Sequence, residues 1–459
     1  VPRQSITKPM TSSGLKNSER TVMTSSPLRA VDTPPHDGDD SDSPLSGTNP
    51  HRRNPLLGHD GSGWIIVVGI GADGMDGIGE RAHRAITSAD VVVGSWRQLQ
   101  LVPDSCQATK KPWPSPLVPH IAELFDSLAD RRVVVLASGD PMFFGIGTTL
   151  ARILGPDAFT VIPAASSASL ACARLGWGLN TTPVVSLLTK PVEILGPLCD
   201  DGIPFLVLCR DSHSPSDICD YLCSRGLGDA RVDLLSDLGS SHEAHAVSTA
   251  RLPEALDAQS NLCIVAVTPT EVGLSRAPGR PDETYANDGQ LTKSDIRALT
   301  LAALAPHPGE ILWDIGGGSG SVSVEWCRLA RDAESYVIEH VHERAARITT
   351  NSLGYPVTVV HGKAPEALDD LPSPDAVFIG GGLTHPGVVD RAWEALRPGG
   401  RFVANAVTVE SEQMVLQLQE KRGGSLTRFE VSHHSALGSF HAWRPALPII
   451  RFVTTKPVV

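Results

Sequence analysis

Residues 312–325 read LWDIGGGSGSVSVE, an apolar strand with an acid near its end, followed by a glycine-rich turn and a helix start. The pattern is D-x-G-x-G-x-G, beginning at Asp314. Glycines are needed in such a turn because Cβ atoms would keep the backbone from closing over a ligand, and because the turn can require positive φ. Glu339 ends the next apolar run, SYVIE, where an acid can accept hydrogen bonds from both ribose hydroxyls of a nucleoside. The compact glycine run favours a nucleoside without a pyrophosphate, which indicates S-adenosylmethionine, over a dinucleotide.

The segments on either side of this loop predict a regular α/β domain over residues 291–459. A helix is expected at 291–305, and apolar strands, each followed by a helix-compatible segment, at 310–316, 335–339, 356–360, 375–381 and 400–407. This alternation is typical of a doubly wound, mainly parallel, Rossmann-like sheet. The late apolar run at 447–457 is expected to add a final antiparallel strand.

A second glycine-rich loop, WIIVVGIGADG at residues 64–74, has the G-x-G-x-x-G spacing of a dinucleotide-binding fingerprint. That reading requires a helix directly after the loop and an acid at the end of the next strand. Here no helix can begin before about Gly79, and the next strand, at 90–94, ends in glycine. We therefore reject a nicotinamide or flavin site at this loop.

The rest of this first half also predicts an α/β architecture, over residues 61–269. Apolar strand-like runs at 64–68, 90–94, 132–138, 159–163, 204–209 and 261–269 alternate with helical segments. Two short polar motifs stand out, SGDP at 138–141 and SS at 166–167, each of which can also be simple turn or helix-cap chemistry. The polar segment 270–290, rich in Gly and Pro, is predicted to be the linker between the two halves.

Composition excludes several classes of function. The 459 residues carry a net charge of −12, which argues against nucleic-acid binding through a basic surface. No apolar run approaches the roughly 18–20 residues of a membrane span. The eight cysteines lack the spacing of a zinc site and are expected to be reduced structural thiols in a cytoplasmic protein. Residues 1–60, rich in Ser, Pro and Asp, are predicted to be a disordered tail without a secretory signal.

The second half resembles the carbon-15 methyltransferase and decarboxylase family of corrin synthesis. The resemblance is carried by LTKSDIRALTLAAL (291–304), DIGGGSGSVSVE (314–325), HGKAPEALDDLPSPDAVFIGGG (361–382) and RFVANAVTVE (401–410). It implies that S-adenosylmethionine is contacted by Thr292, Gly316, Gly317, Gly318, Ser319, Gly320, Glu339 and Ala364. His340-Val341 departs from the charged pair that relatives carry after the acid.

The first half resembles the tetrapyrrole methylase family, in which a glycine loop, an SGDP turn and a serine pair occur together. The resemblance implies two α/β subdomains with S-adenosylmethionine in the cleft between them, and carbon-5 methylation as the activity. It places Gly139, Asp140, Ser166 and Ser167 near the cofactor, and Gly69, Gly71 and Asp73 on the tetrapyrrole side. Ala164-Ala165 stand where relatives carry Pro-Gly before the serine pair.

The order of the two halves resembles the bifunctional methyltransferases of cobalamin synthesis. This implies that two S-adenosylmethionines methylate two meso carbons of precorrin-6B and that the acetate on ring C is decarboxylated, giving precorrin-8x. The resemblance also suggests a homo-oligomer. Alternatives are the same chemistry on the cobalt-containing ring of the anaerobic route, or a methyltransferase on another substrate in which one half only binds.

The reaction needs few catalytic side chains, and no metal. The reduced macrocycle is electron-rich, so its meso carbons can attack a sulfonium methyl directly, and the protein mainly aligns the reactants. A protonated ring nitrogen can take the electrons of decarboxylation. Candidates to guide protons are His385, Lys293 and Asn405, with His361 and Lys363 as further polar groups of the same half. Substrate carboxylates could be held by Arg97, Arg210 and Arg276.

Overall fold

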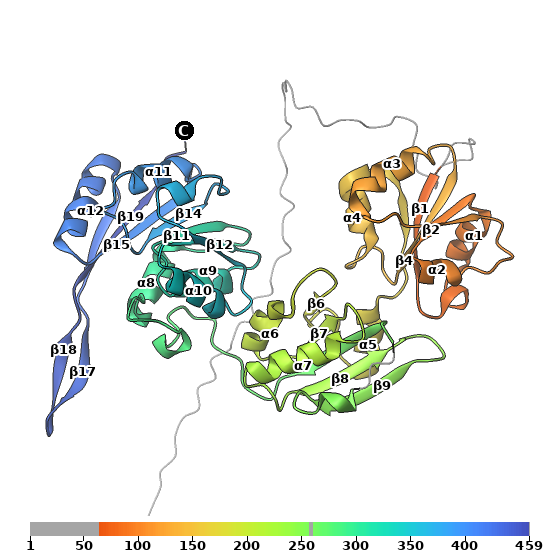
Figure 1. Ribbon diagram of the computed structural model, residues 1–459, viewed down its shortest axis with the longest axis horizontal. Helices are drawn as coiled ribbons and strands as arrows, with labels where there is room; N and C mark the ends of the chain where they lie inside the picture. The colour runs from red at the N-terminus through yellow and green to blue at the C-terminus, as the bar shows by residue number, and fades with distance from the viewer. Residues whose placement is uncertain (1–63, 257–259, 459) are drawn as a thin grey trace, which may run out of the picture. The chain divides into compact units, whose positions relative to one another are not determined.

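The computed structural model describes residues 64–256 and 260–458, so the predicted disordered tail, residues 1–60, lies outside the described residues. The described chain contains three sheets flanked by helices and a separate two-stranded hairpin (Figure 1). Short 3-10 helices occur at Gly74–Asp76, Val118–His120, Pro156–Ala158, Val192–Leu195, Pro253–Ala255, Asp282–Thr284 and Glu366–Leu368.

The first sheet is parallel throughout, in the order β3-β2-β4-β1-β5. The middle residues of its central strands are mostly Val, Ile and Leu and are buried, as expected for a sheet covered on both faces. The strands are β1 (Trp64–Ile70), β2 (Val91–Gly94), β3 (Thr109–Pro112), β4 (Arg132–Ser138) and β5 (Thr160–Ile162), and the helices are α1 (Glu80–Ser88), α2 (Trp96–Gln100), α3 (Ile121–Asp126) and α4 (Ile146–Leu154). Only a 3-10 turn, Gly74–Asp76, directly follows the first glycine loop, and helix α1 begins at Glu80, which confirms that no α-helix starts at the loop.

The second sheet is mixed, in the order β6-β7-β10-β8-β9, and only β6 and β7 pair in parallel. Its elements are β6 (Val184–Ser186), β7 (Phe205–Leu208), β8 (Arg231–Ser236), β9 (Ala244–Thr249) and β10 (Cys263–Thr268), with α5 (Ser167–Leu175), α6 (Gly196–Asp201) and α7 (Ser214–Ser224). We did not predict β6, β8 or β9, because β6 is short, β9 is largely exposed, and β8 places a buried acid, Asp233, in mid-strand.

The third sheet has seven strands in the order β13-β12-β11-β14-β15-β19-β16, and its first five strands are parallel. This confirms the doubly wound sheet and the antiparallel last strand, β19. The strands are β11 (Ile311–Ile315), β12 (Glu334–Glu339), β13 (Val357–His361), β14 (Ala376–Ile379), β15 (Arg401–Ala406), β16 (Ser425–Phe429) and β19 (Ile449–Thr455); the helices are α8 (Ser294–Leu304), α9 (Ser321–Leu329), α10 (His342–Asn351), α11 (Val388–Ala395) and α12 (Val409–Arg422).

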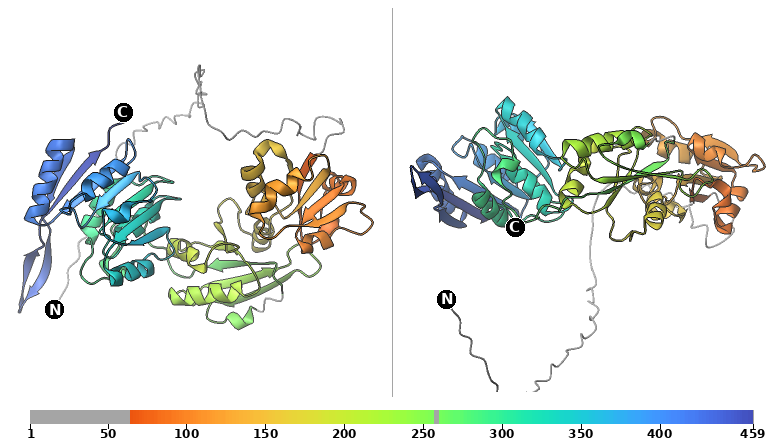
Figure 2. Two further views of the ribbon diagram at one scale, coloured as in Figure 1. Left: turned by 45° about the horizontal axis from the view of Figure 1, so that its top comes forward. Right: turned by 90° about the horizontal axis from the view of Figure 1, so that it is seen from below.

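A hairpin of β17 (Ser432–Leu437) and β18 (Phe440–Pro445) is inserted between β16 and β19 and projects from the third sheet in Figures 1 and 2. It was not predicted, since its side chains are mostly exposed and show no clear polar–apolar alternation.

Residues 270–290 join the second and third sheets with a single 3-10 turn, yet Arg280 and Tyr285 within them are buried. The eight cysteines are all free thiols, and six are buried. Among the described residues, no helix is long and apolar enough to cross a bilayer.

Candidate functional site

The glycine loop of the third sheet connects the end of β11 to the start of α9. Gly316, Gly318 and Gly320 have φ values of 75°, 58° and 75°, a region that residues with a Cβ rarely adopt. A Cβ at Gly316 would lie 2.7 Å from the Cα of Gly381, and one at Gly317 would lie 2.0 Å from Cγ1 of Val337. The loop therefore needs glycine both for its conformation and for its close approach to the neighbouring strands.

Glu339 is held against this loop at the end of β12. Its side chain is 3% exposed; Oε2 accepts a hydrogen bond from the Gly318 amide at 3.0 Å, and Oε1 accepts one from the Val341 amide at 2.9 Å. Each carboxylate oxygen can accept a further hydrogen bond, so the acid is oriented by the backbone and can still receive hydroxyl donors.

Asp314 is a second acid beside the loop, and it is almost fully buried. Its Oδ2 accepts a hydrogen bond from Ser323 at 2.7 Å, whereas its Oδ1 has no partner among the described residues. Burial raises the pKa of the Asp314 carboxyl to about 6; the Ser323 hydrogen bond opposes this shift, and the charge of Glu339 adds to it. A buried acceptor without a partner is costly, which indicates that a donor from a ligand completes the site.

A cavity of about 550 Å³ lies at the carboxyl edge of the third sheet, next to the loop. Such an edge is where doubly wound sheets bind ligands. The structure brings most of the predicted second-half residues to its wall: Thr292, Lys293, Gly316, Gly317, Gly318, Glu339, Lys363, Ala364, His385 and Asn405. Ser319 and Gly320 complete the loop behind the wall, and His361 is an exposed residue at the end of β13 that does not line the cavity.

The three proposed proton-handling residues differ in how they are held. Asn405 donates to Oγ1 of Thr300 at 3.0 Å, and its Oδ1 is buried without a partner in the described chain. Lys293, just before α8, has a side chain 60% exposed and lies 3.4 Å from Asp282. His385 is half-buried in the turn before α11. Asn405 is therefore the most rigidly positioned of the three.

The first-half motifs also come together, although they are far apart in sequence. A Cβ on Gly69 would lie 2.1 Å from the Gly139 carbonyl oxygen and 2.5 Å from the Ala164 nitrogen. A Cβ on Gly139 would lie 3.1 Å from Cα of Ser166. The glycine loop, the SGDP turn and the serine pair thus meet where β1, β4 and β5 end.

The polar side chains of these motifs mostly contact the backbone of their own turns. Ser166 caps α5 by accepting a hydrogen bond from the Ser169 amide, and Asp140 accepts one from the Met142 amide. Asp73 folds over its own loop, against Gly71 and Gly77. Ser167 is the exposed first residue of α5. Cap and turn chemistry therefore explains the Ser166 hydroxyl and Asp140, whereas the close packing of Gly69 and Gly139 requires glycine.

Of the three arginines considered for substrate carboxylates, only Arg97 lies beside a predicted motif. It donates to Oγ of Ser138, the first residue of SGDP, at 2.7 Å, and burial lowers the pKa of its guanidinium. Arg210 pairs with Asp211 at 3.1 Å, and Arg276 pairs with Asp201 at 2.6 Å.

Two features of the second-half cavity were missed as site residues. Asp314 was visible as the acid of the D-x-G-x-G-x-G pattern, but only burial shows that its carboxyl is perturbed. Gly289 and Gln290 line the cavity, although their polar, glycine-containing segment was predicted to be a linker. No local signal marks a linker residue as a cavity wall.

The groups around this cavity fit S-adenosylmethionine. The cofactor has an ammonium group and two ribose hydroxyls as donors, and Asp314 and Glu339 present acceptor oxygens in the same cavity wall. Lys293 and Lys363 supply positive charge on the same wall for carboxylates of a ligand.

Comparisons with known proteins match both halves of the chain. Residues 65–253 match the family of tetrapyrrole (corrin/porphyrin) methylases, and residues 283–456 match the precorrin methyltransferase domain. Over 401 residues the chain is 43% identical to a precorrin-6Y C(5,15)-methyltransferase (decarboxylating) of Sinorhizobium sp., covering 86% of this chain and 97% of the relative.

Two shorter matches have related names. A probable cobalt-precorrin-6B C(15)-methyltransferase (decarboxylating) of Pyrobaculum calidifontis is 36% identical over 142 residues, covering 29% of this chain and 72% of the relative. The solved C-terminal domain of precorrin-6Y C5,15-methyltransferase from Rhodobacter capsulatus is 48% identical, covers 40% of this chain and 100% of that domain, and has a TM-score of 0.38.

Proposed function

This chain belongs to the family of precorrin-6Y C(5,15)-methyltransferases (decarboxylating), and from that premise we propose how its two halves divide the reaction. The family methylates and decarboxylates a precorrin in cobalamin biosynthesis, using S-adenosylmethionine, and this is the activity of the chain. The second half carries carbon-15 methylation and decarboxylation of the ring C acetate, and the first half carries carbon-5 methylation. Precorrin-6B is the substrate, precorrin-8x the product, and two S-adenosylmethionines are consumed.

The observation that carries this division is the second-half cavity. One wall of this cavity holds the glycine loop, the ribose-binding acid Glu339 and the buried acid Asp314, whose Oδ1 has no donor among the described residues. Its volume of about 550 Å³ falls in the usual range for ligand pockets. The bulky macrocycle can therefore present one edge to a cofactor seated on the glycine loop.

The residues of this cavity contribute alignment and charge. S-adenosylmethionine supplies a methyl group on a sulfonium, which the electron-rich meso carbon attacks. Glu339 and the glycine loop hold the nucleoside, and Asp314 holds the ammonium group. Holding carbon, methyl and sulfur in line contributes several kcal/mol to the rate acceleration.

The remaining polar groups handle the substrate. Lys293 and Lys363 hold peripheral carboxylates of the ring by charge-assisted hydrogen bonds. Asn405 orients the edge of the ring with its free amide oxygen, and His385 moves the proton needed when the carboxylate of ring C leaves as carbon dioxide.

The first half provides the second cofactor site. The meeting of Gly69, Gly139 and Ser166 at the ends of three strands supports this assignment, because a cofactor can approach the backbone closely where no Cβ intervenes. In this site Asp140 and Ser167 lie on the cofactor side, and Gly71 and Asp73 face the tetrapyrrole.

The decisive experiment is incubation of the purified chain with S-adenosylmethionine and precorrin-6B, followed by mass spectrometry. The product should gain two methyl groups and lose carbon dioxide. Glu339→Ala should give a product with one methyl group and the acetate intact. Loss of both methyl groups, or of neither, would contradict the assignment of one transfer to each half. If the chain converts the cobalt-containing ring but not the metal-free ring, the cobalt-containing ring is the substrate in place of precorrin-6B.

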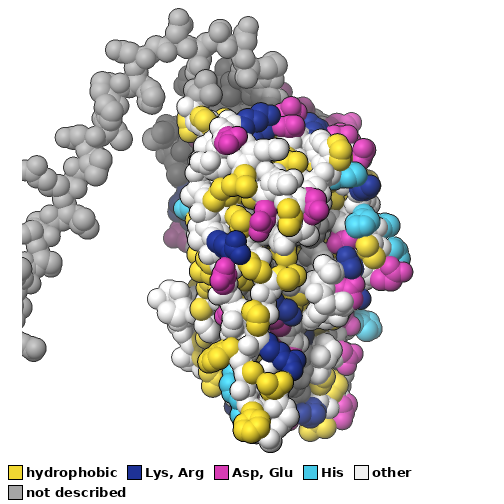
Figure 3. All heavy atoms as spheres, turned by 90° about the vertical axis from the view of Figure 1, so that its left-hand side faces the viewer, with side chains coloured by type: hydrophobic (Ala, Val, Ile, Leu, Met, Phe, Trp, Pro, Cys, Tyr) yellow, Lys and Arg dark blue, Asp and Glu magenta, His cyan; other side chains and the backbone are white. Residues whose placement is uncertain are grey.

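The hairpin supports the homo-oligomer. Phe440, Trp443 and Leu437 are 75%, 71% and 57% exposed, and the face of the molecule on the hairpin side shows hydrophobic side chains among charged ones (Figure 3). A two-stranded hairpin is marginally stable in water on its own, so a second copy of the chain is its natural partner. Phe440→Ser with Trp443→Ser should lower the mass measured by light scattering, whereas Val272→Ser, a change at a residue 93% exposed, should not.

A further inference from the structure

The segment that joins the two halves touches two distant places. We name residues 274–293 the connecting segment. Its first part contacts α6, which belongs to the first half, and its last part lines the second-half cavity. It holds one 3-10 turn and no strand, so side-chain contacts, and not a hydrogen-bonded ladder, set its position.

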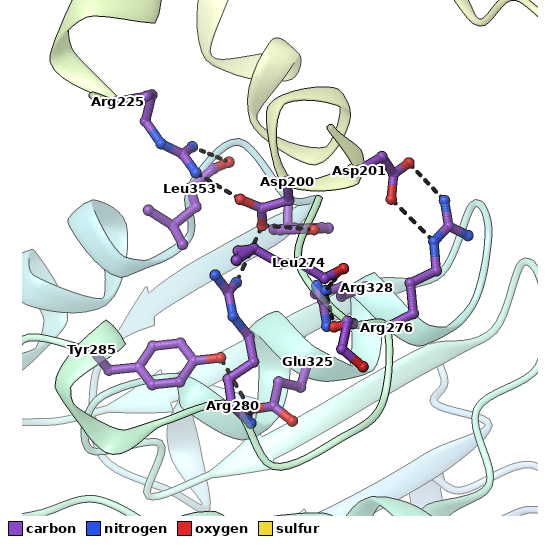
Figure 4. A network of polar contacts seen from close by, with 12 residues as sticks. Asp200, Asp201, Arg225, Leu274, Arg276, Arg280, Tyr285, Glu325, Arg328 and Leu353 are labelled. Atoms are coloured by element: carbon purple, nitrogen blue, oxygen red, sulfur yellow. Dashed lines mark hydrogen bonds and ion pairs between the residues drawn. The ribbon is translucent and has the colours of Figure 1, made fainter. Parts of the chain in front are cut away.

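The first anchor is Asp200 on α6, which is 3% exposed (Figure 4). Its Oδ1 accepts a hydrogen bond from Arg225 at 2.8 Å, and its Oδ2 accepts from Arg280 at 3.1 Å and from the Tyr355 hydroxyl at 3.1 Å. The Asp200 carbonyl also accepts from the Leu274 amide at 2.8 Å. One buried carboxylate of the first half therefore holds the guanidinium groups of Arg225 and Arg280 and the phenol of Tyr355. Of these three groups, Arg280 comes from the connecting segment.

The second anchor is Glu325 on α9, the helix that starts at the glycine loop. It is fully buried and accepts hydrogen bonds from the amides of Gly279 at 2.6 Å and Arg280 at 3.0 Å, and from the Tyr285 hydroxyl at 3.1 Å. Arg297 donates its Nε to the same carboxylate at 2.7 Å. Arg280 is thus fixed twice, with its backbone on Glu325 and its side chain on Asp200.

The cavity end of the connecting segment packs on the cofactor loop. A Cβ on Gly318 would lie 2.8 Å from the Gln290 carbonyl oxygen, so this carbonyl packs closely on the glycine loop. Asn351 accepts a hydrogen bond from the Ala286 amide at 3.0 Å and donates to the Ser319 carbonyl at 2.9 Å. A shift of the connecting segment would therefore move Gln290 and Asn351 against the glycine loop.

We propose that Asp200 of the first half is a positioning residue for the S-adenosylmethionine site of the second half, acting through Arg280 and the connecting segment. This rests on the proposed function, because it takes the second-half cavity as a cofactor site. The link runs from Asp200 to the Arg280 side chain, along the backbone of the connecting segment to Gln290, and from the Gln290 carbonyl to Gly318. Energetic coupling between sites is carried by packed and hydrogen-bonded chains of this kind.

Asp200→Asn in the full-length chain tests the proposal, since it keeps the side-chain size and removes the charge that holds Arg280. Calorimetric titration with S-adenosylmethionine identifies the second-half site as the one that Glu339→Ala removes. Asp200→Asn should weaken that site about tenfold, within the usual 5- to 150-fold range of coupling. It should raise KM for S-adenosylmethionine in carbon-15 methylation, leave kcat at saturating cofactor unchanged, and spare carbon-5 methylation.

The matched control is Asp233→Asn. Asp233 is 1% exposed, lies in the same half, and is paired with Arg231 and His245 at 2.8 and 2.9 Å, neither of which belongs to the connecting segment. It should lower Tm without changing cofactor affinity at the second-half site. Arg280→Met cuts the same link while leaving Asp200 bonded to Arg225 and Tyr355, and serves if Asp200→Asn does not fold.

The outcomes separate the two claims. An affinity within about twofold of the wild type in both Asp200→Asn and Arg280→Met would overturn the coupling, as would an equal loss in Asp233→Asn. If the Glu339→Ala variant binds S-adenosylmethionine as the wild type does, the proposed cofactor site itself is overturned, and the coupling with it.

Discussion

Gly317→Ala tests whether the glycine loop needs its second glycine for space. Gly317 has no positive φ, so alanine can adopt its backbone conformation. The added Cβ would lie 2.0 Å from Cγ1 of Val337 on β12, whereas carbon atoms in contact are about 3.5–4.0 Å apart. Val337 is fully buried, and its β-branched side chain has little rotamer freedom. Either the loop or the strand must therefore move.

The expected cost follows from this overlap. Overpacking of a well-packed site costs about 1–3 kcal/mol. If the glycine loop takes up the displacement, S-adenosylmethionine should bind about 5- to 150-fold more weakly, since about 1.4 kcal/mol is a factor of ten. The affinity of the second-half site is measured by calorimetry, and Tm records any general loss of stability.

Val337→Ala is the compensating change. It removes the clashing methyl and leaves Cβ of Val337 3.6 Å from the new Cβ, an ordinary contact. Val337→Ala alone should cost about 1.6 kcal/mol of stability for two lost methylene equivalents, plus a cavity term. The double variant should recover most of the cofactor affinity, which gives a coupling energy of about 1–3 kcal/mol.

Gly316→Ala is the contrasting variant, because its φ of 75° and its 2.7 Å approach to Gly381 involve backbone alone. Val337→Ala should not rescue it. Equal affinity in Gly317→Ala and wild type, or no recovery in the double variant, would refute the steric account of the loop.

Three further outcomes are expected. S-adenosylmethionine should bind the second-half site more weakly below about pH 6 in calorimetry, because Asp314, with its pKa raised to about 6, loses its charge there, and Asp314→Asn should flatten this profile. The folded chain takes up that proton at a higher pH than the unfolded chain, so without cofactor the same acidification should stabilise the fold in urea titrations. Glu325→Gln should lower the free energy of unfolding by about 1.5–3 kcal/mol, because fully buried Arg297 loses the nearer of its two carboxylate partners and keeps only Asp282, at 3.3 Å; a change under about 1 kcal/mol in urea titrations would contradict this. Gly69→Ala, whose Cβ would lie 2.1 Å from the Gly139 carbonyl, should suppress carbon-5 methylation and spare carbon-15 methylation, as read from singly methylated product by mass spectrometry.

Local patterns predicted the parts of the chain whose structure depends on near neighbours. β11, β12 and β14 are short apolar runs between glycine or polar turns, and burial on both faces of a parallel sheet requires such runs. The glycine loop and Glu339 could be predicted for a similar reason. Positions with positive φ require glycine, and the acid ends the next strand, so both occur at fixed spacings in the sequence. β8 escaped prediction because its polar Asp233 is buried only by pairing with Arg231 and His245.

The sequence by itself determined the α/β class, the order of the two halves and the glycine loop, because backbone conformation and strand burial depend on residue type at neighbouring positions. Only the tertiary structure decided that the linker is a wall of the second-half cavity. Its Gly, Pro and polar residues have the composition of a flexible connection. Arg280 and Tyr285 within it are nevertheless buried, because Asp200 and Glu325, from elements distant in sequence, supply their partners. Such pairing depends on which acids the folded chain brings together, and residue type along the segment carries no record of it.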